Sequence, residues 1–200
     1  MSSEFRWSRG SAYESYVGRW SRLVAAEFVP WLGVPTGATW IDVGCGTGEL
    51  TRSILRLAAP SRVVSLDPSA GYLEHARATT TDPRVEFRQG NDQDVRSIGT
   101  TADAVVWGLV LNFVADPVQA LRAAAGVTNP GGLVAAYVWD YADGMTMMRH
   151  FWGAAFDEDP AARSGGEGSR FPFCKPEPLN AAFDTAGLSG RGHPANRCNG

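Results

Sequence analysis

Three glycines, Gly44, Gly46 and Gly48, stand at alternate positions where a β-branched apolar run gives way to a helical pattern. Glycine adopts backbone conformations closed to other residues and lets a ligand approach the main chain closely. The start of the helix that follows would offer unpaired N–H groups and the positive end of its dipole. The spacing therefore predicts a ligand-binding turn, although a single glycine-rich turn can also be a simple connector.

Two carboxylates accompany this turn. Asp42 precedes the first glycine, where it would repel a pyrophosphate but could accept hydrogen bonds from a cationic amino group or a bound water. Asp67 ends the next apolar run, about 20 residues downstream, where nucleotide-binding folds place a carboxylate on ribose hydroxyls. Because Pro68 and a helical pattern follow, Asp67 could also serve as a helix cap. The Gly-x-Gly-x-Gly spacing disfavours a nicotinamide oxidoreductase, whose fingerprint is Gly-x-Gly-x-x-Gly.

Short apolar runs alternate with helical patterns over the middle of the chain. Such an alternation is typical of βαβ units, and nearly continuous apolar runs suit a parallel sheet that is covered on both faces. We therefore expect an α/β fold with a doubly wound, mostly parallel sheet. The predicted strands are Thr39 to Val43, Arg62 to Leu66, Val85 to Arg88, Ala104 to Trp107 and Leu133 to Trp139.

The helical patterns between these strands each predict one apolar face. Asp116 and Pro117 have the residue types of an N-cap and a first helical position. The sequence Asn-Pro-Gly-Gly at 129–132 predicts a turn into the fifth strand. The inward-facing residues are expected to be Leu50, Ile54, Leu55 and Ala58 in the first helix, Tyr72, Leu73 and Ala76 in the second, and Val118, Leu121 and Ala125 in the third.

We expect three regions: an N-terminal helical cap over residues 1–38, a binding core over 39–141, and post-core helices with an irregular tail over 142–200. The cap would contain an amphipathic helix that Pro30 ends or kinks near Val29. The last region would contain a helix from Met145 to Phe156 and another from Leu179 to Ala186, closed by Gly187. The face of the cap helix is expected to carry Trp20, Leu23, Val24, Phe28 and Leu32.

Five successive segments resemble the motifs of class I S-adenosylmethionine-dependent methyltransferases, in the right order from Thr39 to Asp140. They are IDVGCGTGEL, VVSLDPSAGYLEHAR, VEFRQGNDQDV, DAVVWGLVLNFVADPVQAL and NPGGLVAAYVWDY. The likeness is strongest to the small-molecule branch that includes the quinone-biosynthesis enzymes, methyltransferase type 11. It implies a Rossmann-like methyltransferase fold, S-adenosyl-L-methionine as cofactor, and in-line transfer of a methyl group to a small-molecule acceptor.

The resemblance also assigns roles to individual residues. It implies that the three glycines line the methionine and ribose portion of the cofactor, with Asp42 near its amino group and Cys45 as a small packing residue. Asp67, followed by Pro68, would hold the ribose hydroxyls. Where the family has Gly-Asp-Ala, with the Asp on the adenine amino group, this chain has Gly90-Asn91-Asp92. Either Asn91 or Asp92 could make that contact.

The methyl acceptor is expected beyond the carboxyl end of the fourth strand. Trp107, Gly108, Leu109 and Asn112 would border the transferable methyl group, although Trp107 could instead belong to the core. His150 and Trp152 complete the candidate substrate pocket.

Little acid–base machinery is needed, because a sulfonium already carries an activated methyl group and the protein mainly aligns the acceptor. The catalytic residues are therefore not identified. His75 is expected to be solvated, and His193 lies in the tail.

The family's sixth and seventh strands have no recognisable counterpart after Gly187, because β-branched alternation is missing there. We therefore expect a shortened version of the domain, with an apolar sheet edge beside the fifth strand. The alternative function is a protein that binds the cofactor but no longer turns over.

Composition narrows the classes of partner. The net charge of −3 gives no basic stripe for nucleic acid, and no apolar run is long enough to span a membrane. Cys45, Cys174 and Cys198 are too few and too far apart for a disulfide framework, and they lack metal-site spacing. We expect a cytoplasmic protein without a structural metal; the sequence does not indicate an oligomeric state.

Overall fold

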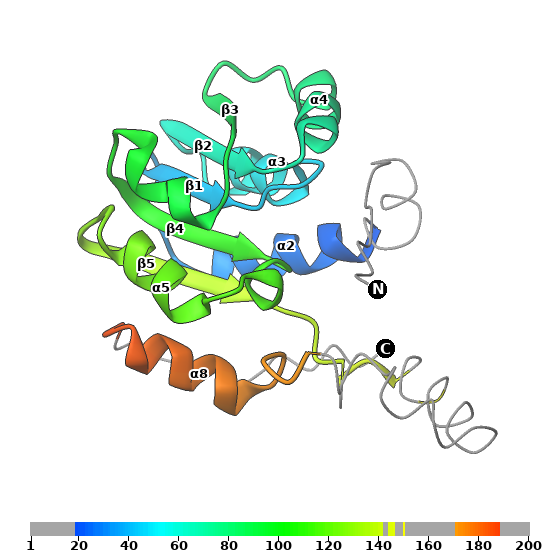
Figure 1. The fold of residues 1–200 in the computed structure, drawn as a ribbon. Helices are drawn as coiled ribbons and strands as arrows, with labels where there is room; N and C mark the ends of the chain where they lie inside the picture. The colour runs from blue at the N-terminus through cyan, green and yellow to red at the C-terminus, as the bar shows by residue number, and fades with distance from the viewer. Residues whose placement is uncertain (1–18, 142–143, 147–149, 151–170, 189–200) are drawn as a thin grey trace.

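The computed structural model describes residues 19–141, 144–146, 150 and 171–188 of the chain (Figure 1). Within them, helices lie on both sides of a five-stranded sheet, in the order β3-β2-β1-β4-β5. Every pair of neighbouring strands is parallel. The strands are β1 Thr39–Val43, β2 Arg62–Asp67, β3 Val85–Gln89, β4 Ala102–Gly108 and β5 Thr128–Tyr137.

The direction in which the sheet is built reverses between β1 and β4. From β1 the chain adds β2 and β3 on one side, and it then crosses back to add β4 and β5 on the other. In open parallel sheets the crevice at such a switch point, beyond the carboxyl ends of the strands, is where ligands bind. The fold class is therefore the predicted doubly wound α/β sheet, and the glycine turn after β1 lies at its switch point.

The predicted strands agree with the structure except at their ends, most clearly in β5. The turn predicted at 129–132 is instead an irregularity inside β5, since Ala102 pairs with Thr128 while Ala104 pairs with Leu133. Gly131 adopts a left-handed φ of 81° there. The strand resumes after the interruption because its apolar residues still pair with β4.

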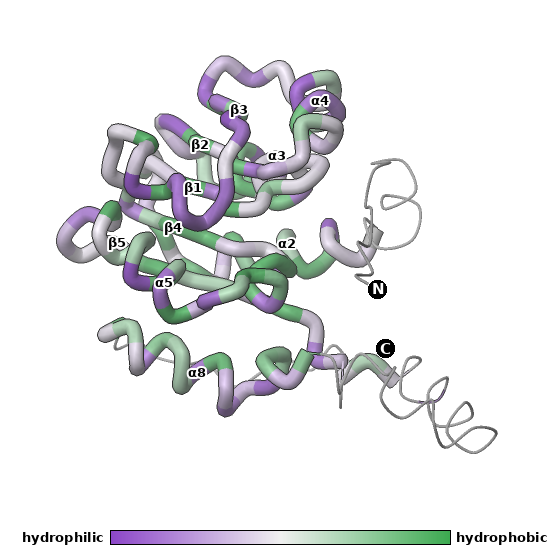
Figure 2. Tube along the Cα trace, in the orientation of Figure 1, coloured by the Kyte–Doolittle hydropathy of each residue, from purple (hydrophilic) through white to green (hydrophobic). Residues whose placement is uncertain are grey.

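Two apolar layers cover the sheet. On one face, α2 and α3 pack over Trp40, Val63 and Val106; on the other, η2, α5 and α8 pack over Ile41, Val64 and Trp107. Figure 2 shows that β3, at the edge of the sheet, is coloured as hydrophilic because of its charged residues, unlike the apolar central strands. The helices are α2 Arg19–Trp31, α3 Glu49–Leu57, α4 Ala70–Thr79, η2 Asp92–Ile98, η3 Leu111–Phe113, α5 Pro117–Ala125 and α8 Pro176–Thr185.

The buried face of α2 agrees with the prediction at Phe28 and differs from it toward the start of the helix. Ala25, Phe28 and Val29 are buried, whereas Trp20 and Leu23 are 50% and 60% exposed. The helix also continues through Pro30 to Trp31. A proline so near the end of a helix removes only one hydrogen bond of the last turn, so it does not stop the helix at once.

Capping residues set the ends of the later helices. Asp116 accepts a hydrogen bond from the Gln119 N–H at 2.9 Å, and Pro117 is at the start of α5, as predicted. The buried face of α5 includes Leu121, as predicted, and Val118 is partly buried against the same core; the other buried positions are Ala120, Ala123 and Ala124, whereas Ala125 is only partly buried. Helix α8 begins at Pro176, earlier than predicted, and Gly187 follows its end with φ 81°.

Most of the helix predicted from Met145 to Phe156 lies outside the described residues. In the part of the chain that the structure describes, β5 forms one edge of the sheet. The same part contains no helix of the length and apolar character needed to cross a membrane. It also contains no cluster of three or more His, Cys, Asp or Glu side chains suited to a metal ion.

Candidate functional site

The glycine turn folds back onto the end of β2. The N–H groups of Gly44 and Cys45 both donate to the Leu66 carbonyl, at 2.7 and 2.8 Å. The turn closes with a 2.9 Å hydrogen bond from the Gly48 N–H to the Cys45 carbonyl. All three glycines have positive φ, which residues with a Cβ rarely adopt. The conformation predicted from the spacing is therefore present.

The three glycines nevertheless serve different purposes. A Cβ on Gly44 would lie 2.5 Å from Val110, so a neighbouring side chain excludes it. Gly48 immediately precedes α3, and a Cβ on it would lie 3.2 Å from Arg52 and 3.3 Å from the methyl group of Ala76. A Cβ on Gly46 would meet nothing within 4 Å. Among these three glycines, Gly46 alone therefore has open space beside its Cα.

Asp67 joins the turn to the loop after β2. Its Oδ2 accepts a hydrogen bond from the Gly46 N–H and its Oδ1 one from the Ser69 N–H, both at 2.8 Å. Burial raises the pKa of Asp67, while these two N–H groups lower it in part. The cap of α4 is Ser69, which accepts from the Tyr72 N–H at 3.3 Å. The alternative that Asp67 itself caps this helix is therefore wrong.

Asp42 lies fully buried beneath the turn. Its Oδ2 accepts a 2.7 Å hydrogen bond from the Thr51 hydroxyl, whereas its Oδ1 is buried and has no hydrogen-bond partner. Burial raises the pKa of Asp42 to about 7; the Thr51 hydrogen bond opposes this rise, and the charge of Asp67 adds to it. A buried carboxylate oxygen without a partner is costly, so it is a functional candidate.

A third carboxylate braces the turn from the side of α3. Glu49, at the first position of this helix, is buried and pairs with Arg52 at 2.8 Å and with Arg22 of α2 at 3.5 Å. Arg52 also donates to the Thr47 carbonyl at 2.9 Å. This ion-pair network fixes the outer side of the turn and links it to α2.

After β3, Asn91 is a capping residue. Its amide oxygen accepts from the Gln93 N–H at 2.8 Å, and its own N–H donates to Asp94 at 2.9 Å. This reciprocal capping box starts η2. Asn91 is exposed, and the neighbouring Asp92 is half-buried. Both therefore stay candidates for the adenine contact, because the Asn91 oxygen keeps a second acceptor site beyond its cap bond and the cap does not use Asp92.

The loop after β4 contains a strained residue. Leu109 has φ 61°, although it is not a glycine, and its N–H donates to the Tyr137 carbonyl at 2.9 Å. The next residue, Val110, packs on Gly44. The Asn112 amide nitrogen is buried without a hydrogen-bond partner. Trp107 is fully buried in the core, which confirms the alternative that the sequence analysis allowed for it.

The remaining predicted residues are only partly brought together. Cys45 is buried in the turn, and burial raises the pKa of its thiol, as suits a packing residue. Pro68 and His150 are exposed, and His75 is half-buried rather than solvated. Trp152 and His193 lie outside the described residues.

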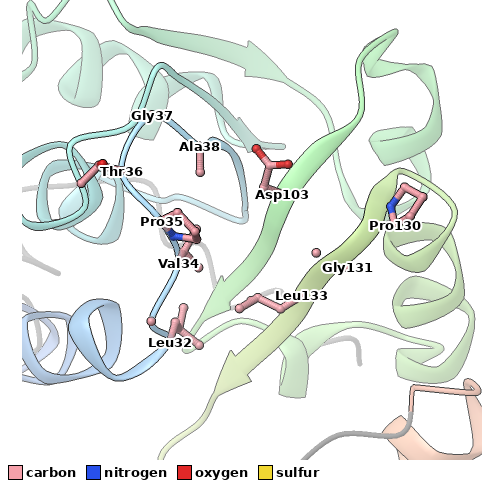
Figure 3. A pocket seen from close by; sticks show the side chains of 12 residues that line it. Leu32, Val34, Pro35, Thr36, Gly37, Ala38, Asp103, Pro130, Gly131 and Leu133 are labelled. Carbon is pink, nitrogen blue, oxygen red and sulfur yellow. The ribbon is translucent and has the colours of Figure 1, made fainter.

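A cavity of about 570 Å³ lies near the amino ends of β1 and β4, at the end of the sheet away from the glycine turn (Figure 3). It is lined by the loop before β1 and by the irregular part of β5. Its carboxylate, Asp103, already accepts 2.8 Å hydrogen bonds from the Thr39 N–H and from Asn129. Asp103 therefore fastens β1 and β5 to β4, and none of the predicted site residues lines this cavity.

Sequence reasoning missed three residues of the site: Val110, Thr51 and Ser65. Thr51 and Ser65 are fully buried, and their hydroxyl oxygens are 2.8 Å apart. A usable signal was present, since both are polar residues within otherwise apolar patterns. No local signal identified Val110, because its contact with Gly44 joins two loops distant in the sequence.

Comparison with known proteins shows what these features resemble. Residues 41–136 match the family model described as "Methyltransferase domain". A 2-phytyl-1,4-naphtoquinone methyltransferase from Thermosynechococcus vestitus is 39% identical over 109 residues, which are 54% of this chain and 48% of that protein. The chain thus spans about half the length of this curated relative.

Solved structures agree on the fold. A SAM-bound amino pentose methyltransferase from Micromonospora echinaspora has a TM-score of 0.53 and 29% identity, covering 64% of this chain and 56% of that one. A structure described as a putative S-adenosyl-L-methionine-dependent methyltransferase, from Methanococcus maripaludis, has a TM-score of 0.62. It is 20% identical and covers 95% of this chain and 90% of its own, which supports the fold alone.

We expect Gly44→Ala to lower the free energy of unfolding more than Gly46→Ala does. Both variants force a Cβ into a left-handed conformation, at about 1 to 2 kcal/mol. Only Gly44→Ala also clashes with Val110, which adds about 1 to 3 kcal/mol. Urea denaturation would measure both. In the double variant with Val110→Ala the extra loss should shrink; strictly additive effects would contradict the contact.

Asp42→Asn should stabilise the protein at high pH. Because the pKa of Asp42 rises from 3.8 to about 7 on folding, ionising it costs stability progressively across that window. The asparagine avoids this cost, so its advantage over the wild type should be smallest near pH 4 and reach a few kcal/mol above pH 7. Denaturation at pH 4.5 and pH 8 would test this, and an equal difference at both would count against it.

Proposed function

We propose that this chain, whose residues 41–136 match a methyltransferase domain, is a class I methyltransferase that transfers the methyl group of S-adenosylmethionine to a small-molecule acceptor. The observation that carries the proposal is the open space at Gly46, whose N–H is held by the Asp67 carboxylate, together with the buried carboxylate of Asp42 at the end of the adjacent strand. Negative charge at this turn suits a ligand with a sulfonium and an ammonium group, and it repels a pyrophosphate.

The residues present fit this cofactor. Asp67 is positioned to accept from the ribose hydroxyls, because each of its oxygens keeps acceptor capacity beyond one N–H bond. Asp42, with an oxygen that lacks a partner, is suited to the ammonium group. Either Asn91 or Asp92 is suited to the adenine amino group. When bound, the cofactor supplies an electrophilic methyl group on its sulfonium.

The chain's own part in the reaction is alignment and exclusion of water. Leu109 and Val110 form the wall of the site on the side of β4, and their loop is fastened to the turn at Gly44 and to β5 at Tyr137. We place the acceptor beside this loop, where Asn112 offers an amide donor. The relative from Thermosynechococcus vestitus is named for a quinone substrate. For this chain we propose only a small molecule.

A binding assay and a transfer assay test the proposal in turn. Calorimetry should detect S-adenosylmethionine and S-adenosylhomocysteine binding and no comparable binding of NADH. Incubating a metabolite extract with a methyl-labelled donor should then yield a labelled small molecule. Binding without any labelled product would support the alternative of a protein that binds the cofactor without turnover. Binding of NADH alone would overturn the proposal.

Asp67→Ala should weaken S-adenosylmethionine binding by roughly 1.5 to 3 kcal/mol for each charge-assisted hydrogen bond lost. That corresponds to at least a tenfold higher Kd in calorimetry. Asp82→Ala is the matched control, since Asp82 is a carboxylate paired with Arg84 beside β3, away from the turn. Unchanged affinity in Asp67→Ala would remove this residue from the proposed site.

A further inference from the structure

Three buried polar side chains form a chain of hydrogen bonds beneath the glycine turn. Asp42 on β1 and Ser65 on β2 are partners in the sheet register, and Thr51 of α3 lies over both. The Thr51 hydroxyl is 2.7 Å from Asp42 Oδ2 and 2.8 Å from the Ser65 hydroxyl. All three residues are 0% exposed. Polar groups this deeply buried need partners, and here they supply one another.

The direction of donation along this series of hydrogen bonds is defined. The Thr51 hydroxyl has a single proton, which it donates to Asp42 Oδ2. It can then only accept from Ser65, so the order of donation is Ser65 to Thr51 to Asp42. The chain ends on a carboxylate oxygen that must accept. This arrangement favours the ionised form of Asp42, although burial alone would favour the protonated form.

The same arrangement makes the two oxygens of Asp42 unequal. Oδ2 is held by Thr51, whereas Oδ1 has no partner in the described part of the chain. The other titratable groups coupled to this site are Asp67 at the end of β2, whose charge disfavours ionisation of Asp42, and the Cys45 thiol in the turn. On α3, Glu49 and Arg52 pair with each other.

We infer that Thr51, held by Ser65, is a positioning residue that fixes Oδ2 of Asp42 and leaves Oδ1 to accept from the ammonium group of the bound cofactor. This inference rests on the proposed function. It assigns a role to two side chains that make no contact with the ligand. It also predicts that cofactor binding has an acid limb governed by Asp42, because a protonated carboxyl binds a cation poorly.

The test compares wild type, Thr51→Val, which keeps the shape but loses the hydroxyl, and Thr51→Ser, which keeps the hydroxyl. The ¹³C signal of the Asp42 carboxyl is followed against pH without ligand, with Asp42→Asn to assign it. Binding of S-adenosylhomocysteine is measured between about pH 5 and 6.5, where its ammonium group stays charged.

In Thr51→Val the carboxyl should titrate at higher pH, and the acid limb of binding should move with it. Below the limb, binding should weaken about tenfold for each pH unit of that movement. In Thr51→Ser the titration of the Asp42 carboxyl and the acid limb of binding should both stay near those of the wild type. Ser65→Ala should shift both by less than Thr51→Val does.

An unchanged carboxyl titration in Thr51→Val would overturn the inference. So would equal weakening of binding at every pH, since that is what a purely structural role of Thr51 predicts. If the wild type bound the nucleoside at no pH, the proposed function would fail. The carboxyl titration would still decide separately whether Thr51 sets the ionisation of Asp42.

Discussion

The glycine turn depends on where its main-chain N–H groups find acceptors. Gly44 and Cys45 use the Leu66 carbonyl, and Gly46 uses the Asp67 carboxylate, so the turn is fastened to the end of the neighbouring strand. These bonds bring the carboxyl ends of β1 and β2 to one place. The shape of the glycine turn therefore depends on the neighbouring strand as well as on the residues of the turn itself.

The site is built at a cost in stability. Asp42 is buried with one oxygen lacking a partner, and the charge of Asp67 raises its pKa further. A protein selected for stability alone would not keep such a group. The arrangement is understandable if a cationic ligand relieves the cost, since binding then gains what folding loses. The hydroxyl chain from Ser65 through Thr51 offsets part of this cost in the meantime.

The side of the site that we assign to the acceptor is joined mechanically to the glycine turn. Val110 packs on Gly44, and the strained Leu109 is held by the Tyr137 carbonyl at the end of β5. The Tyr137 ring packs edge-on against Phe28 of α2, with centroids 4.7 Å apart. Helix α2 is therefore connected to the loop after β4 through this ring contact and the main-chain hydrogen bond between Tyr137 and Leu109. Because Val110 packs on Gly44, a movement of the loop after β4 would shift the glycine turn, and the reverse also holds.

The sequence by itself determined the order of the strands along the chain, the cap at Asp116 and the backbone conformation of the glycine turn, because periodicity, caps and glycine spacing are local signals. It misplaced the buried face of α2, since Trp20 and Leu23 are as apolar as the residues that are buried. Tertiary structure alone decided that Gly44 is required by Val110, and that Thr51 and Ser65 meet Asp42. These contacts join residues from different elements, and a local pattern cannot encode which side chains the packing of helices on a sheet will bring within hydrogen-bond distance.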